Sequence, residues 1–140
     1  MTLVLDASVA MRWLADDGSA EDKTYAKLIL RRIISEDVQA FVPAHWSLEV
    51  AHVLARGERR GSITADMAEL FLTTLGAINI YTDHDTSVLA LTSILDLSRL
   101  YNLSSYDAAY LELAMRLECP LATLDKDLRR AAERAGVEVV

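Results

Sequence analysis

In TLVLDASVA, residues 2–10, a short apolar run leads directly into an acid. The run 2–5 predicts a buried β-strand, and Asp6 would stand at its carboxyl end. The same arrangement returns near the end of the chain, where the run 121–124 is followed by Asp125. If the two strands are parallel neighbours, both carboxylates lie on one edge of the sheet.

Between these two ends, short apolar runs alternate with longer segments of helical periodicity. Further strands are predicted at 40–42, 78–80 and 137–140. Helices are predicted at 22–34, 44–56, 65–75, 86–100 and 105–117, with a last one at 128–135. This alternation predicts an α/β fold, with a parallel β-sheet flanked by helices on both faces.

The composition is that of one globular domain covering residues 1–140. The chain has 52% hydrophobic and 25% charged residues, with few glycines and prolines. No basic leader precedes Asp6, no apolar run approaches the roughly 18 residues of a membrane span, and Cys119 is the only cysteine. We therefore expect a cytoplasmic protein without a membrane partner or a disulfide, in which Cys119 is a packing residue.

Two further acids lie at the edges of predicted apolar faces. Glu49 borders the apolar stripe of the helix 44–56, and Asp107 is the third residue of a helix that Ser104 can cap. Each acid also has an ordinary explanation: Asp6 and Asp107 as helix-cap residues, Asp125 as a turn residue, and Glu49 as an ion-pair partner of Arg56. Together they point to one acidic site, because all four occur at strand ends, helix starts or apolar margins.

Such a cluster has an electrostatic consequence. Two carboxylates about 6 Å apart at an effective dielectric near 20 repel by roughly 3 kcal/mol. The cluster must therefore take up protons or bind cations, and carboxylate oxygens select hard divalent ions such as Mg²⁺ or Mn²⁺. A bound cation would also offset the net charge of −7, which has the wrong sign for a general nucleic-acid-binding surface.

Four segments resemble the PIN domain, and specifically the VapC-type toxins of bacterial and archaeal toxin-antitoxin pairs. They are LDASVA (5–10), SLEVAHVL (47–54), SSYDAAYLELA (104–114) and LATLDKDL (121–128). The resemblance implies a metal-dependent endoribonuclease whose catalytic, metal-binding acids are Asp6, Glu49, Asp107 and Asp125, with metal-activated water cleaving RNA phosphodiesters. It also implies that Ser8 and Thr123 orient these acids. Its expected partners are an RNA substrate such as tRNA or another structured RNA, a cognate antitoxin, and a second copy in a homodimer.

One position departs from the family pattern, because His52 stands where the family often has asparagine three residues after the helix glutamate. Glu49-x-x-His52 has the spacing of a di-iron helix, but a di-iron bundle needs a second such pair, which the chain lacks. His52 is interpreted here as a hydrogen-bonding neighbour of the acids. His45 is interpreted as a surface residue at a helix start.

Arg56, Arg59 and Arg60 follow Glu49 at the end of the same predicted helix. They either complement the helix C-terminus or contact RNA phosphates. Asp127 is predicted to cap the last helix, and whether it also joins the acidic site is left open.

Other functions remain as alternatives. The same acids would serve a structure-specific DNA nuclease, or could survive in a catalytically inactive binding module. Phosphoryl transfer through an aspartyl intermediate is disfavoured, because such enzymes of the haloacid-dehalogenase kind place a second acid two residues after the first, where this chain has Ser8.

Overall fold

The architecture comes from a computed structural model that describes residues 1–14, 18–35 and 38–140. Its sheet has four short strands, all parallel, in the order β3-β2-β1-β4. They are β1 (Thr2–Leu5), β2 (Gln39–Val42), β3 (Ile80–Thr82) and β4 (Leu121–Ala122). The predicted parallel α/β fold is confirmed, and β1 and β4 are direct neighbours, as a shared edge for Asp6 and Asp125 requires.

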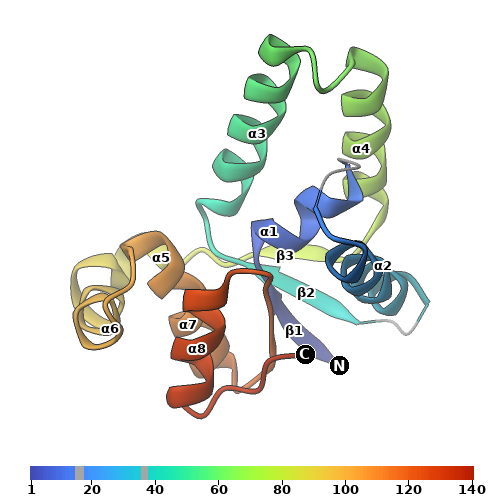
Figure 1. Cartoon of the computed structure of the whole chain (residues 1–140). Coiled ribbons are helices and arrows are strands. Elements are labelled where there is room, and N and C mark those ends of the chain that lie inside the picture. Colours follow the sequence, from blue (N-terminus) through green and yellow to red (C-terminus); the bar gives the residue numbers. More distant parts are fainter. Residues whose placement is uncertain (15–17, 36–37) are drawn as a thin grey trace.

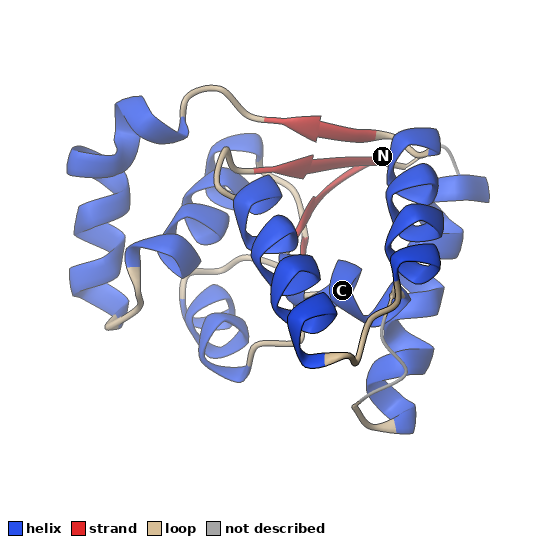
Figure 2. Ribbon diagram, turned by 90° about the horizontal axis from the view of Figure 1, so that it is seen from above, coloured by secondary structure: helices blue, strands red, loops and turns tan. Residues whose placement is uncertain are grey.

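Helices make up most of the molecule, and the short strands lie among them (Figures 1 and 2). The α-helices are α1 (Ala7–Ala10), α2 (Ala20–Ser35), α3 (Trp46–Arg60), α4 (Ala65–Ala77), α5 (Thr86–Leu89), α6 (Leu95–Tyr101), α7 (Ser105–Leu117) and α8 (Lys126–Arg134). A 3-10 turn, η1 (Met11–Trp13), follows α1, and a π-helical turn, η2 (Ala90–Ile94), joins α5 to α6. None of the described helices combines the length and apolarity needed to cross a membrane.

Three sequence predictions of secondary structure need correction. The helix predicted at 86–100 is interrupted by the π-helical turn η2, and the strand predicted at 137–140 is reduced to a single bridge between Leu121 and Val139. The last helix is capped by Asp125 and not by Asp127, because Asp125 has an extended backbone and its Oδ1 accepts a 2.9 Å hydrogen bond from the Leu128 amide. The helix therefore begins earlier, at Lys126.

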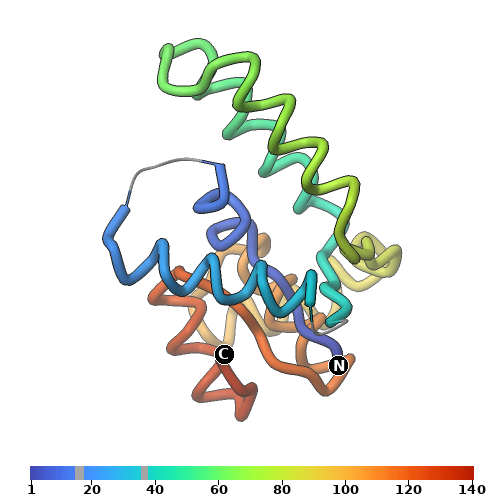
Figure 3. The backbone as a smooth tube through the Cα atoms, turned by 90° about the vertical axis from the view of Figure 1, so that its right-hand side faces the viewer, coloured from blue at the N-terminus to red at the C-terminus, as the bar shows by residue number. Residues whose placement is uncertain are grey.

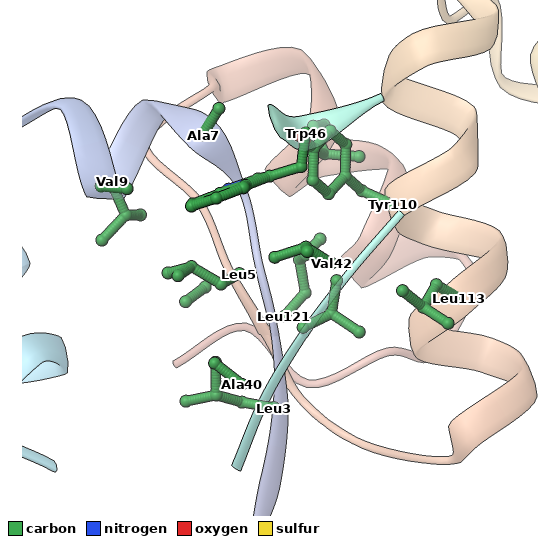
Figure 4. Close-up of a cluster of buried hydrophobic side chains, with 14 of the residues drawn as sticks. Leu3, Leu5, Ala7, Val9, Ala40, Val42, Trp46, Tyr110, Leu113 and Leu121 are labelled. Atoms are coloured by element: carbon green, nitrogen blue, oxygen red, sulfur yellow. The ribbon is translucent and has the colours of Figure 1, made fainter. Parts of the chain in front are cut away.

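The core is formed where helices pack on both faces of β1. Leu3, Val4 and Leu5 are fully buried, as a central strand of a parallel sheet should be. Figure 4 shows Tyr110 and Leu113 of α7 on one side of the strands and Val9 of α1 on the other. Cys119 packs against this core, as predicted.

Helices α3 and α4 form a hairpin that extends away from the sheet (Figures 1 and 3). Its turn contains Gly61 in a left-handed conformation (φ 76°), and the Thr64 hydroxyl caps α4 by accepting from the Met67 amide. Near the turn, Gly57 lies so close to Ile63 that a Cβ at Gly57 would stand 2.2 Å from Ile63 Cδ1. This close approach closes the outer end of the hairpin.

Candidate active site

The most deeply buried acid is Asp6, which follows β1 and is only 4% exposed. Its Oδ2 accepts two hydrogen bonds of 2.7 Å, one from the Ser8 hydroxyl and one from the hydroxyl of the fully buried Thr123. Asp6 stands at the N-cap of α1 but its side chain makes no capping bond, so its carboxylate is not an ordinary helix cap. The structure thus brings Asp6, Ser8 and Thr123 together, and the role of Ser8 and Thr123 in orienting a metal-binding acid stays a prediction.

The same two hydroxyls tie the end of β4 to the start of α1. The Asp125 amide donates to Thr123 Oγ1 at 3.0 Å, and the Leu124 amide donates to Ser8 Oγ at 3.0 Å. These bonds place Asp125 on the same edge of the sheet as Asp6. Thr123, the residue after β4, directs its hydroxyl to Asp6.

Glu49 enters the site from the first turn of α3. Its Oε1 accepts a 2.8 Å hydrogen bond from the hydroxyl of Tyr110 and lies 3.1 Å from Nε2 of His45. Tyr110 is fully buried in α7, so this bond fixes α3 to α7 at the level of the acids. The contact replaces the ion pair with Arg56 that was weighed from the sequence.

The contacts of His45 and Tyr110 with Glu49 were not predicted from the sequence. The prediction of His45 as a surface residue was wrong: its side chain is only 15% exposed, and its ring packs edge-on against Tyr106 and Tyr110. The available signals were weak. His45 precedes Glu49 by one helical turn and Tyr110 follows Asp107 by one turn, so each shares a face with an acid.

Asp107 joins the site from the first turn of α7. The predicted cap is confirmed, because the Ser104 hydroxyl accepts a 3.1 Å hydrogen bond from the Asp107 amide. Burial, followed by the charges of Asp125, Asp6 and Glu49, raises the pKa of Asp107 to about 6. All three other acids therefore act on Asp107 electrostatically, and the four form one acidic site.

The pKa values of Asp6 and Glu49 shift in opposite directions. Burial raises the pKa of Asp6 above its usual value despite the bonds from Ser8 and Thr123, and the charges of Glu49 and Asp125 add to the rise. Burial alone would also raise the pKa of Glu49, but its contacts with His45 and Tyr110 outweigh burial and hold that pKa below its usual value. Glu49 thus stays charged where Asp6 and Asp107 resist ionisation.

Three of these acids share a pattern that suits metal binding. In each of the three acids, only one of the two carboxylate oxygens accepts a described hydrogen bond from the protein. These oxygens are Oδ2 of Asp6, Oε1 of Glu49 and Oδ1 of Asp125. One oxygen orients the group while the other carries no described bond, and such oxygens are ligands that hard divalent cations prefer. Across residues 1–14, 18–35 and 38–140, no three His, Cys, Asp or Glu side chains already form a compact metal centre.

Comparisons with known proteins identify the family of the chain. The model of the PIN domain family matches residues 3–134. The chain belongs to the PIN-domain family. Among solved structures it is similar to PAE2754 from Pyrobaculum aerophilum, with 20% identity, 94% of this chain and 87% of that chain covered, and a TM-score of 0.62. It is also similar to FitAcB from Neisseria gonorrhoeae, with 18% identity, 98% and 95% covered, and a TM-score of 0.61. At such identities these two structures support the fold alone, and no curated protein gave a significant match.

Not every predicted site residue of this PIN domain lies with the acids. His52 is exposed on α3 and lines a groove of about 420 Å³ with Arg56, Arg59 and Arg60. Within the part of the chain that the structure describes, no contact joins His52 to an acid of the site. Asp127 is exposed and pairs with Arg130 at 2.5 Å, so its carboxylate is engaged on the outer surface of α8.

Proposed function

We propose that this PIN domain is a divalent-metal-dependent endoribonuclease. Asp6, Glu49, Asp107 and Asp125 would hold Mg²⁺ or Mn²⁺, and the bound ion would activate water and neutralise charge on the phosphodiester. The observation that carries the proposal is that the bonds from Thr123 to Asp6 and from Tyr110 to Glu49 bring the acid-bearing segments together, and the charges of the other three acids raise the pKa of Asp107 there. A site that opposes its own ionisation gains most from a cation.

Hydrogen bonds from other residues of the chain orient three of the four carboxylates. Ser8 and Thr123 fix the orientation of the Asp6 carboxylate, and Tyr110 fixes that of Glu49. Asp125 is held by the Leu128 amide at the start of α8. The carboxylates of Asp6, Glu49 and Asp125 are therefore oriented before a cation or substrate arrives, which lowers the cost of binding either one.

The choice of RNA and the biological role rest on the resemblance of the four motifs to VapC-type toxins. We propose that the protein is the toxin of a type II toxin-antitoxin system, that it acts in the cytoplasm on tRNA or another structured RNA, and that a cognate antitoxin neutralises it. Homodimer formation is part of the same proposal.

The direct test is cleavage of labelled total RNA, and of DNA with matching sequence, with Mg²⁺, Mn²⁺ or EDTA. Wild type should cut RNA only with a divalent ion, and Asp107→Asn should be inactive. Asp66→Asn is the matched control, because Asp66 is an exposed acid in the first turn of α4 and its loss changes the charge equally. RNA cleavage in EDTA would reject metal dependence, and cleavage of DNA instead of RNA would indicate the alternative DNA nuclease. RNA binding without cleavage of either polymer would indicate a binding module.

The toxin role has its own test in cells. Expression of wild type should arrest growth, and expression of Asp107→Asn should not. Co-expression with the reading frame upstream of the gene should restore growth and yield a complex. Growth arrest by Asp107→Asn would mean that toxicity does not come from cleavage. Light scattering of the purified protein would decide whether it forms a homodimer.

A further inference from the structure

A second charged feature lies on the same helix as Glu49 but outside the acidic site. The groove lined by His52, Arg56, Arg59 and Arg60, here called the α3 basic groove, has a volume of about 420 Å³ and consists of exposed side chains. They recur at intervals of three and four residues after Glu49, so they form one stripe along α3. The stripe begins at an acid of the site and runs outward along the α3–α4 hairpin.

The arginines of the groove differ from other arginines of the molecule in having no described partner. Arg116 is bound by Glu112 and Asp83, and Arg130 is bound by Asp127. By contrast, within the parts of the chain that the structure describes, no ion pair or hydrogen bond engages the side chains of Arg56, Arg59 and Arg60. In a chain with a net charge of −7, three arginines without acidic partners form a local site for an anion.

The helix end does not account for this cluster. Arg59 and Arg60 do lie in the last turn of α3, where cations are favoured. Backbone groups already close that end, because the amides of Gly61, Ser62 and Ile63 donate to α3 carbonyls. Arg56 and His52 also lie before the last turn, beyond the range in which the helix dipole is effective.

The position of the groove decides which anion it can meet. Arg56 is seven residues and Arg60 eleven residues after Glu49, which places them about 10 Å and about 16 Å farther along the helix axis. At about 100° per residue, both return to within about 20° of the direction of Glu49. They face the same side as the acid and lie farther along the helix, so they are placed to meet phosphates beyond the one bound at the acids.

We propose that the α3 basic groove binds backbone phosphates of one RNA strand, on one side of the bond that is cut. The inference rests on the proposed nuclease function, and it adds a direction in which the substrate leaves the site. Side chains that contact phosphates position a strand without reading its sequence. The groove therefore contributes affinity in the ground state and the transition state alike, and changes KM without changing kcat.

The test compares two double variants with the same change in charge. Arg56→Gln/Arg60→Gln removes two groove cations, and Arg31→Gln/Arg99→Gln removes two exposed cations from α2 and α6. Binding of a fluorescent single-stranded RNA is measured in EDTA at several salt concentrations, after circular dichroism has shown both variants to be folded. The groove variant should flatten the log-log salt slope by about 1.4 and weaken binding about 25-fold near 0.1 M salt, from roughly 0.7 per phosphate contact.

Cleavage of RNAs extended on only the 5′ side or only the 3′ side of the cut then gives the direction. The groove variant should raise KM for one of the two extensions, with kcat unchanged and the shortest substrate cut as by wild type. Unchanged RNA affinity, an equal loss in the control pair, or equal effects on both extensions would overturn the inference. The cleavage assay and the binding series test the two proposals separately. If wild type cuts no RNA, the proposed nuclease function is wrong, and the binding series in EDTA still decides whether the groove binds phosphates.

Discussion

The acidic site and the α3 basic groove share helix α3, which carries Glu49 and the groove, but they are built in opposite ways. Asp6 is held by a hydroxyl that follows β4, and Glu49 by a tyrosine of α7. The arginines of the groove extend from a single helix, and among the residues that the structure describes none binds their side chains. Acids that must hold a cation between them need fixed positions, and bonds from other elements supply them. Arginines that contact a flexible RNA strand need to adjust, and side chains without protein partners can do so.

The largest expected effect concerns the acids themselves. Asp6→Asn, Glu49→Gln and Asp107→Asn should each reduce RNA cleavage to background while leaving the metal-free fold intact, because each change removes one of several mutually repelling charges. Mg²⁺ or Mn²⁺ should raise the melting temperature of wild type but much less that of Asp6→Asn, by linkage of binding to folding. Equal shifts in both proteins would place the ion elsewhere, and wild-type turnover in any variant would remove that residue from the site.

The next prediction tests whether the orientation of the Asp6 carboxylate affects metal binding and cleavage. Thr123→Val keeps the shape of a fully buried side chain but removes the hydroxyl that donates to Asp6, so metal affinity or activity should fall about 10- to 100-fold. Thr123→Ser retains the hydroxyl and should recover most of the loss. Metal titration by calorimetry and cleavage rates would measure both. Equal losses in the valine and serine variants would indicate packing alone.

A smaller effect is expected at the outer end of the hairpin. Gly57→Ala should destabilise the protein by about 1–3 kcal/mol, because the new Cβ would lie 2.2 Å from Ile63 Cδ1 and 2.6 Å from its Cγ1, which forces the isoleucine to move. Gly76→Ala in α4 is the matched control, since its Cβ would meet nothing within 4 Å. That change should stabilise the protein by about 0.5–1 kcal/mol.

Urea denaturation would measure the stability of both glycine variants. Neither variant should change the affinity of the acidic site for Mg²⁺, because both glycines lie outside that site. A loss of metal affinity in Gly57→Ala, with none in Gly76→Ala, would show that the hairpin end and the acids are coupled.

The smallest effect is the pH dependence of the metal-free protein. Folding raises the pKa of Asp107 to about 6, so the folded state favours its protonated form, and stability should increase as the pH falls from about 7 through 6. The raised pKa of Asp6 acts in the same direction. The lowered pKa of Glu49 opposes this only as the pH nears its usual value of 4.5, so pH 5 to 7 is the useful window.

Urea midpoints in EDTA at several pH values would measure this dependence. Asp107→Asn should flatten it, and Asp66→Asn, which changes an exposed acid, should not. If wild type instead loses stability between pH 7 and pH 5, the acids do not repel one another in the folded state as proposed.

Local sequence was enough to predict much of the fold and part of the site. The apolar runs ending at Asp6 and Asp125, the cap at Ser104 and the helical periodicity of α2, α3, α4 and α7 depend on neighbouring residues, so each could be recognised from its own segment. Parallel pairing of β1 with β4 then places the two strand-end acids on one edge. Local patterns were insufficient where one residue shifts the backbone, as in the π-helical turn η2 and in the choice of Asp125 over Asp127 as the cap of α8.

The side chains that hold Asp6 and Glu49 could be identified only from the packing of distant segments. Tyr110 and Glu49 are 61 residues apart in sequence, and Thr123 and Asp6 are 117 apart. Periodicity indicates which face of a helix is buried. It does not indicate which residue packs against that face, or where along the helix axis the contact lies. Those features follow from the packing of α7 on β1 and of β4 beside β1, and the same packing brings His45 to the acids while leaving His52 on the outer surface of α3 with the arginines.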